Sequence, residues 1–165
     1  NQRPLSATWT VTGSGAFVLS TTRSKARITG ITTGKIVDYG VKDSMNMGAA
    51  MAPAACDVIY HHLLDFERKP EDYDKIITGD LGKVGKEILI KLLREKGIDI
   101  AEIHTDCGIE IFDCEEQGTQ SGGSGCGCSA KRILFVPTGA LLSTVSFNEG
   151  QSVPGIAHAI VIEHA

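Results

Sequence analysis

The sequence predicts an α/β fold in which a β-sheet carries helices on its faces. Segments rich in Ile, Val and Thr alternate with segments whose apolar residues recur at helical spacing. Glycine-containing turns separate these segments, as expected where a strand gives way to a helix. With 165 residues, 42% of them hydrophobic, the chain has the size of one domain or of one structural half of a larger one.

The first part of the chain predicts two strands and a helix. Residues 8–20 have the pattern of a strand interrupted by glycine, and residues 26–37 are rich in Ile and Thr, which favour extended backbone. Asn46 is expected to cap the helix, and Pro53 lies near enough to the helix start to be tolerated. The predicted apolar face consists of Met51, Ala55, Val58, Ile59, Leu63 and Phe66.

The middle of the chain continues the alternation. Residues 75–80 predict a short buried strand that ends in turn residues, and residues 82–96 predict a helix that ends at Gly97. The apolar stripe of this helix is Ile88, Leu89, Leu92 and Leu93. Residues 107–112 predict a further strand.

The last part predicts a loop and two strands. Residues 121–129 are mostly glycine and small residues, and residues 133–136 and 155–162 predict strands. A parallel crossover needs on the order of a dozen residues, yet none separate the loop from the strand at residue 133. Either the strands pair in another way or a segment is absent. We favour an absent segment between residues 130 and 131.

Charge, hydropathy and cysteine content bear on several protein classes. The net charge is −4 and the Lys and Arg residues are scattered, so the sequence predicts no nucleic-acid partner. No apolar run approaches about 18 residues, and no signal peptide is expected from the N-terminal pattern. Five cysteines, an odd number, favour free thiols in a reducing compartment.

Short motifs are spread over nearly the whole chain. They lie at residues 10–16, 47–55, 78–81, 104–108, 122–130, 137–143 and 154–158. The Gly-Gly-Ser-Gly-Cys-Gly-Cys-Ser sequence at 122–129 is the most specific of them, whereas a glycine-rich first strand is shared across thiolase-like proteins. Taken together, these motifs resemble the stage V sporulation protein AD family.

The resemblance implies a thiolase-like fold. Such proteins consist of two similar βαβαβαββ halves, each with a central mixed sheet flanked by helices, and residues 1–165 resemble the C-terminal half. In the family a helix normally lies where this sequence passes from residue 130 to residue 131. The resemblance also implies that the chain packs against its own N-terminal half, and fold-level analogy implies a homodimer.

The resemblance implies a function in spores. The family is known for binding dipicolinic acid, a pyridine dicarboxylate that accumulates with calcium, and for belonging to the channel that moves dipicolinate during sporulation and germination. Other SpoVA membrane channel subunits are therefore expected partners, with cytoplasmic synthesis and a peripheral location on the spore inner membrane. No cofactor is expected; dipicolinate is the ligand, and whether calcium enters with it stays open.

Condensing chemistry is not expected from this chain. Thiolase-like enzymes need a cysteine thiolate and donors that stabilise an oxyanion. Aligned with the ketoacyl-synthase branch, the chain has Gly79 or its neighbour in place of the catalytic His and Ser124 in place of the Asn. No His lies between His62 and His104. We therefore expect no enzymatic activity.

The candidate ligand-binding residues lie at strand ends and in the glycine-rich loop. A planar dianion needs N–H groups, hydroxyls or cations around its carboxylates, and apolar walls against its ring. Small residues expose backbone N–H groups, and α/β sheets bind ligands at the carboxyl ends of strands. Because two carboxylates repel each other, Asp80 can meet a ligand carboxylate only if it is protonated or if a water or a cation bridges the two groups. The predicted residues are Asp80, Gly123, Ser124, Gly125, Cys126, Thr138 and Gly139.

Two other functions are alternatives to ligand binding. One is a thiolase-like acyl-CoA acyltransferase in which Asp80, His104 or His158 replaces the missing donors. The other is an assembly subunit that holds channel proteins together without a ligand. Acyl transfer from a thioester distinguishes the first, and membrane association independent of the pocket distinguishes the second.

The remaining Cys and His residues favour structural roles. Cys126 and Cys128 are spaced unlike the usual zinc ligands, so no metal site is expected. His158 is expected to be a buried histidine with a hydrogen-bond partner. Asp106 and Cys107, if adjacent on a strand, point to opposite faces, whereas His104 and Asp106 can share a face.

Overall fold

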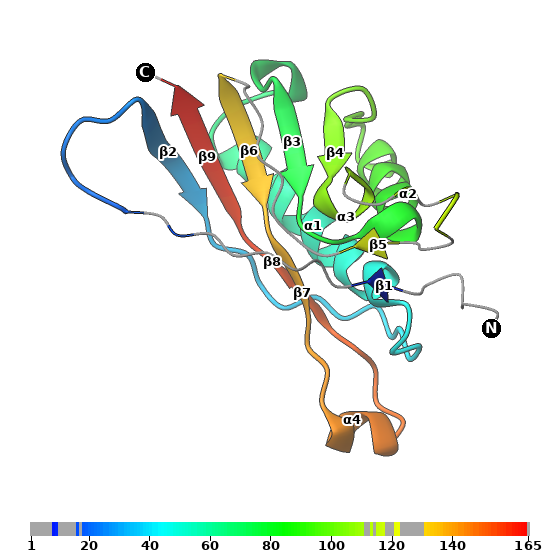
Figure 1. Ribbon diagram of the computed structural model, residues 1–165. Helices are drawn as coiled ribbons and strands as arrows, with labels where there is room; N and C mark the ends of the chain where they lie inside the picture. The colour runs from blue at the N-terminus through cyan, green and yellow to red at the C-terminus, as the bar shows by residue number, and fades with distance from the viewer. Residues whose placement is uncertain are drawn as a thin grey trace.

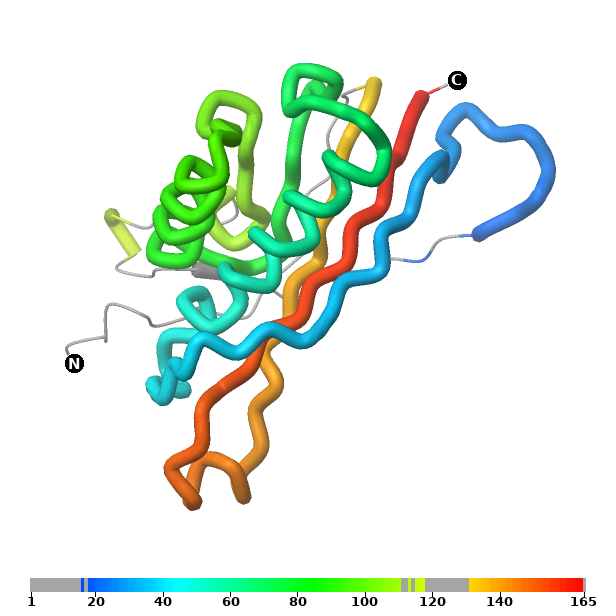
Figure 2. The backbone as a smooth tube through the Cα atoms, turned by 180° about the vertical axis from the view of Figure 1, so that it is seen from behind, coloured from blue at the N-terminus to red at the C-terminus, as the bar shows by residue number. Residues whose placement is uncertain are grey.

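The computed structural model describes residues 8–9, 16, 18–110, 113, 115–117, 121–122 and 131–164. Within this part of the chain, five strands form a mixed sheet and two long helices cover one face of it (Figure 1). Figure 2 shows the molecule from behind, with both helices in front of the sheet. The expected α/β fold, with a central mixed sheet flanked by helices, is confirmed.

The strands follow one another across the sheet in the order β2-β9-β6-β3-β4. They are β2 (Ala26–Thr32), β3 (Lys75–Thr78), β4 (His104–Asp106), β6 (Arg132–Val136) and β9 (Ala159–His164). β3 runs parallel to both of its neighbours, β4 and β6, whereas β9 runs antiparallel to β6 and β2. The carboxyl ends of β3, β4 and β6 therefore meet at one edge of the sheet.

The first long helix, α1, spans Met47–Asp65. Asn46 caps it, because its side-chain oxygen accepts a hydrogen bond from the Ala49 N–H at 3.3 Å. The predicted apolar face is buried except for Phe66, which is half-buried at the helix C-cap. Pro53 lies inside the helix and is buried. The helix, its cap and its buried face were all correctly predicted.

Replacing Asn46 with alanine is expected to lower the free energy of unfolding by about 1 kcal/mol, because the Ala49 N–H loses its acceptor. The Asn46→Asp variant keeps an acceptor at the same position and serves as the control. Urea unfolding followed by circular dichroism measures both variants. Equal midpoints for Asn46→Ala and the unmodified chain would contradict this role for the cap.

The second long helix, α2, spans Gly82–Glu95, and Gly97 follows it with a φ of +77°. This left-handed conformation suits glycine after a helix, as the sequence predicted. Leu89 and Leu93 of the predicted stripe are fully buried, whereas its other members are half-buried. Leu89 and Leu93 therefore face the sheet, whereas Ile88 and Leu92 lie at the margin of the buried face.

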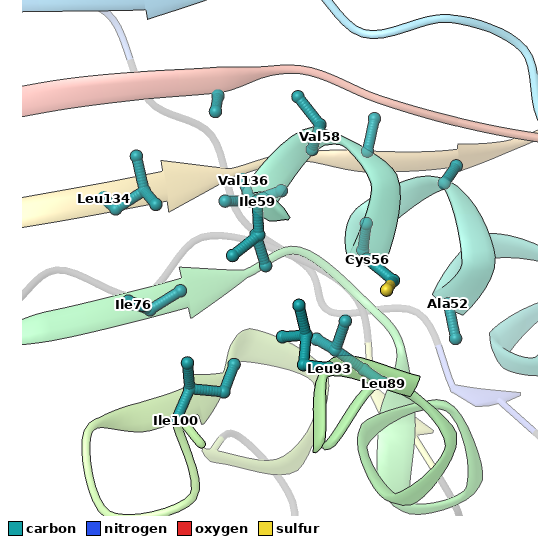
Figure 3. Packing of buried hydrophobic residues seen from close by; sticks show 14 of the residues in the cluster. Ala52, Cys56, Val58, Ile59, Ile76, Leu89, Leu93, Ile100, Leu134 and Val136 are labelled. Atoms are coloured by element: carbon teal, nitrogen blue, oxygen red, sulfur yellow. The ribbon is translucent and has the colours of Figure 1, made fainter. Parts of the chain in front are cut away.

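The core lies between the helices and the covered face of the sheet (Figure 3). Its fully buried side chains include Ile59 of α1, Ile76 of β3, Leu89 and Leu93 of α2, and Leu134 of β6. Full burial of one such side chain contributes roughly 1.5–3 kcal/mol. Because the contributors come from both helices and two central strands, the core fixes the helices against the sheet.

An arm extends from the sheet beyond the carboxyl end of β6 (Figure 1). It consists of β7 (Thr138–Ala140), the short helix α4 (Thr144–Asn148) and β8 (Gly155–Ala157), with β7 and β8 paired antiparallel. Val145 and Phe147, near the tip, are more than half exposed. The arm returns the chain to β9.

The strand predicted over residues 107–112 is wrong. The strand at this place, β4, ends at Asp106, and α3 (Cys107–Glu110) follows it directly. The Asp106 carboxylate accepts a hydrogen bond from the Gly108 N–H at 3.1 Å, which turns the backbone. This side-chain bond to the backbone two residues later competes with extended structure, and the sequence pattern did not show it.

The first predicted strand falls mostly outside the described residues. Within residues 8–20, β1 covers Thr8–Trp9 and pairs parallel with β5 (Ser121–Gly122). Val18 and Leu19 are exposed and belong to no strand. Apolar residues at these two positions therefore indicated a strand that the described part of the chain does not contain.

Two other strands differ from their predicted bounds. The strand predicted over residues 26–37 ends at Thr32, and Val37 forms an isolated bridge to Gly155. The strand predicted over residues 155–162 is divided into β8 and β9 at His158. Because of this division, the chain pairs first with β7 of the arm and then with β6 and β2 of the sheet.

The connection from β4 to β6 runs through residues 107–131, and β6 lies parallel to β3. Residues 123–130 lie outside the described part of the chain, so the absent helix between residues 130 and 131 stays a prediction. The expectation of free thiols is wrong for Cys107, which is disulfide-bonded. Cys56 is a free, buried thiol, and burial raises the pKa of this thiol to about 11.

Candidate functional site

The candidate site is the carboxyl edge of β3, β4 and β6. Thr78, the last residue of β3, pairs with Asp106 on one side and Val136 on the other. The residues that follow each strand therefore emerge at the same place, where α/β sheets bind ligands. The register brings Asp80 and Thr138, two of the predicted ligand-binding residues, to this edge.

Gly79 and Thr138 lie in close contact at the edge. A Cβ atom at Gly79 would lie 3.2 Å from the Thr138 backbone nitrogen and 3.3 Å from its Oγ1, so a side chain at Gly79 would press on Thr138. Thr138 Oγ1 is buried and has no hydrogen-bond partner within the described residues. A buried hydroxyl without a partner is unfavourable by about 1–3 kcal/mol. A polar group that approaches Thr138 would remove this penalty.

The other predicted ligand-binding residues have different outcomes. Asp80 is half-buried between β3 and α2, and Gly139 is half-buried in β7, opposite Ile156 of β8. The loop residues Gly123, Ser124, Gly125 and Cys126 lie outside the described residues. β5, which immediately precedes them, lies beside α2 and α3.

Asp106 lies at this edge, and its carboxylate accepts four hydrogen bonds. It is fully buried, and its carboxylate accepts hydrogen bonds from Thr78 Oγ1 at 2.6 Å and from three backbone N–H groups. These belong to Leu81 at 2.9 Å, Gly82 at 3.0 Å and Gly108 at 3.1 Å. Burial raises the pKa of Asp106, and the four hydrogen bonds oppose the rise.

His104 shares the covered face of the sheet with Asp106, as the sequence predicted. Thr78 Oγ1 gives its hydrogen to Asp106, so it accepts the hydrogen bond from His104 Nε2 at 2.9 Å. His104 Nδ1 is buried and has no hydrogen-bond partner within the described part of the chain. Burial and the nearby charge of Lys86 lower the pKa of His104 to about 3, so the imidazole is neutral at pH 7.

Sequence reasoning missed a second buried histidine, His62, on α1. Its Nδ1 lies 2.7 Å from Thr32 Oγ1 and its Nε2 lies 2.6 Å from the Tyr73 hydroxyl, while its ring stacks on Phe66. Burial and the charge of Arg68 lower the pKa of His62 to about 4. Its spacing from Ile59 and Phe66 on the apolar face was the signal that could have found it.

The expectation of a buried His158 is wrong, because this side chain is exposed. Its Nδ1 does have the expected hydrogen-bond partner, since it accepts from the Gly34 N–H at 3.1 Å. His158 occupies the break between β8 and β9, where the chain leaves one pairing for the other. At that break the side chain turns to solvent.

Neither a membrane-spanning helix nor a metal-binding cluster is present in the described ranges. No helix among these residues is long and apolar enough to cross a bilayer. Nor do three or more His, Cys, Asp or Glu side chains of this part of the chain gather at positions suited to a metal ion.

Comparison with known proteins identifies the family. The family model of stage V sporulation protein AD matches residues 1–131 and residues 129–163. Stage V sporulation protein AD of Bacillus subtilis (strain 168) is 43% identical over 180 residues, an alignment that covers 99% of this chain and 53% of that protein. The chain thus spans about half the length of this curated relative. The chain belongs to the stage V sporulation protein AD family.

Proposed function

We propose that this chain is the C-terminal half of a thiolase-like, non-catalytic protein that binds dipicolinic acid. In this proposal the protein is a component of the spore membrane dipicolinate channel and acts in sporulation and germination. Its partners are other SpoVA membrane channel subunits and its own N-terminal half, and it forms a homodimer. It is synthesised in the cytoplasm and lies peripherally on the spore inner membrane.

The observation that carries the proposal is the buried hydroxyl of Thr138, which lies against Gly79 and has no hydrogen-bond partner within the described residues. Thr138 can donate its hydrogen to a ligand carboxylate, and because Gly79 has no side chain, the backbone and hydroxyl of Thr138 lie directly against it. Asp80 lies two residues beyond β3 and can meet a carboxylate through a cation such as calcium, or through water. The edge thus forms one wall of the site, and the other half of the protein forms the opposite wall.

The geometry of His104 supports a non-catalytic role. A proton-handling imidazole needs a free nitrogen directed at substrate and a pKa near the working pH. The Nε2 of His104 is instead bonded to Thr78, and its pKa is about 3. Gly79 stands at the turn where the ketoacyl-synthase branch has its histidine. Ligand binding requires neither a nucleophile nor a base at this edge.

The alignment supports the proposed absent segment. The two family-model matches meet at residues 129–131, and the alignment with the relative is 180 residues long against 165 in this chain. Both features are expected if the relative carries residues that this sequence lacks between residues 130 and 131.

Titration calorimetry with dipicolinate tests the binding proposal, using the protein that carries this chain together with the proposed N-terminal half. Replacing Thr138 with valine is expected to weaken binding roughly 10- to 100-fold, because a hydrogen bond to a charged group contributes about 1.5–3 kcal/mol. Thr29 is exposed in β2, so Thr29→Val is the matched control. The absence of saturable heat at millimolar dipicolinate in the unmodified protein would refute the proposal.

A co-precipitation experiment from spore membranes separates binding from assembly. If the protein binds dipicolinate and also associates with channel subunits, Thr138→Val is expected to lose the ligand and keep the association. Association without any dipicolinate binding in the unmodified protein would favour an assembly subunit instead.

A further inference from the structure

We infer that Asp106 is a positioning residue that holds Gly79 and Asp80 in place at the ligand-binding edge. This inference rests on the proposed function, since it concerns the residues that would meet dipicolinate. Asp106 itself is fully buried and lies on the covered face of the sheet, so it acts through the backbone of the neighbouring turn.

Asp106 is hydrogen-bonded to both ends of the turn at residues 78–81. Its Oδ2 atom accepts hydrogen bonds from Thr78 Oγ1 at 2.6 Å and from the Leu81 N–H at 2.9 Å. Gly79 and Asp80 are the two residues between these anchors. Because both anchors meet one oxygen atom, the path of the two intervening residues is restricted, and so is the contact between Gly79 and Thr138.

The turn has no cap of its own. Leu81 is the N-cap of α2 and makes no side-chain capping bond, and Gly82 has a left-handed φ of +65°. The first N–H groups of a helix need acceptors from elsewhere. Asp106 supplies them from the adjacent strand, because its two oxygens accept from the Leu81 and Gly82 N–H groups. Without this carboxylate, the turn loses its capping acceptors.

His104 adds a bond to the pair Thr78 and Asp106. A carboxylate only accepts, so Thr78 Oγ1 gives its hydrogen to Asp106 and itself accepts from His104 Nε2. The three side chains therefore form one directed series of hydrogen bonds, from His104 through Thr78 to Asp106. Replacing Thr78 breaks the series without removing the carboxylate.

The same bonds affect where an anion can bind. A helix N-terminus attracts anions through its free N–H groups and its dipole. At α2 the Leu81 and Gly82 N–H groups are already taken by Asp106, whose own carboxylate interacts with the dipole. These two N–H groups are therefore not available to a ligand carboxylate, which leaves the Thr138 hydroxyl as a candidate donor at this edge.

Two isosteric variants test the inference in the protein with both halves. Asp106→Asn replaces one acceptor oxygen by an N–H₂ donor, and Thr78→Val removes the hydroxyl, while Thr78→Ser keeps it. Both loss variants are expected to weaken dipicolinate binding at least about tenfold, because each removes a charge-assisted hydrogen bond. Leu93→Ala removes a fully buried side chain at the far end of α2 and controls for general destabilisation. Thr78→Ser and Leu93→Ala are expected to bind within about twofold of the unmodified protein.

Amide hydrogen exchange of Leu81 and Gly82 gives a readout that does not need the ligand. Exchange at these two positions is expected to rise about tenfold or more in Asp106→Asn and Thr78→Val but not in Leu93→Ala. If the unmodified protein does not bind dipicolinate, the proposed function fails and exchange alone decides the inference. Unchanged exchange, or unchanged affinity in a folded loss variant, overturns it. If Asp106→Asn does not fold, the pair Thr78→Val and Thr78→Ser decides.

Discussion

Alanine at position 34 is expected to leave the protein unfolded or severely destabilised. A Cβ atom at Gly34 would lie 1.7 Å from the Ala157 carbonyl oxygen and 3.0 Å from its carbonyl carbon. Both atoms belong to the backbone of β8, so no side chain can rotate to relieve the overlap. The chain after β2 and the arm would have to separate. Overpacking that moves backbone costs about 3 kcal/mol or more, a large part of the roughly 5–15 kcal/mol that stabilises a typical domain.

Gly139→Ala is the control for this experiment. A Cβ atom at Gly139 would meet only Ile156 Cγ2 at 3.5 Å, which is an ordinary contact. This variant is expected to change the free energy of unfolding by no more than about 0.5 kcal/mol. Urea unfolding of both variants measures the difference. A Gly34→Ala variant as stable as Gly139→Ala would show that β8 does not approach Gly34 as the structure indicates.

Acidification from pH 6.5 to pH 4.5 is expected to destabilise the protein, and the two buried histidines contribute about 4 to 5 kcal/mol to this loss. Burial, assisted by Arg68, lowers the pKa of His62 to about 4, and burial, assisted by Lys86, lowers that of His104 to about 3. In the unfolded chain both titrate near pH 6.5. Between these values the unfolded state binds one more proton at each histidine, so stability falls by about 1.4 kcal/mol per pH unit per histidine.

Asp106 acts in the opposite direction. Burial raises its pKa, so the folded protein takes up a proton there before the unfolded chain does, which favours the folded state as the pH falls. The loss due to the two histidines is steepest at roughly pH 5 to 5.5, where they are protonated in the unfolded chain and neutral in the folded protein.

Unfolding free energies measured by urea denaturation at several pH values test this dependence. His62→Gln is expected to remove the share of one histidine from the slope, about 1.4 kcal/mol per pH unit. His61→Gln alters an exposed neighbour on the same helix and is the matched control for the loss of a histidine. A stability that is constant from pH 6.5 to 4.5 would show that the buried imidazoles accept protons without unfolding.

The elements that local pattern dictates could be predicted from the sequence. The apolar spacing from Met51 to Leu63 and the capping side chain of Asn46 predicted α1. Leu89 and Leu93, with Gly97 behind them, predicted α2. In these cases the information lies within a few turns of chain, and packing against the sheet agrees with it.

The parts that depend on tertiary hydrogen bonds could not be predicted. The Asp106 carboxylate that accepts from Gly108 at the start of α3 also accepts from the N–H groups of Leu81 and Gly82, which lie far from it in the sequence. The ends of β3 and β6 could be recognised, so Asp80 and Thr138 were candidates for the site. That Gly79 would lie against Thr138 required the register of two parallel strands, which the sequence does not specify.

β9 occupies an internal place in the sheet, between β6 and β2. Within the described part of the chain, β2 pairs only with β9. β9 therefore connects β2 to β6, and both of these strands are translated before β9. A nascent chain that lacks residues 159–164 has β2 unpaired and one edge of β6 open. β2 can therefore join the sheet only after β9 has been made, and until then the open edges of β2 and β6 are sites where aggregation can begin.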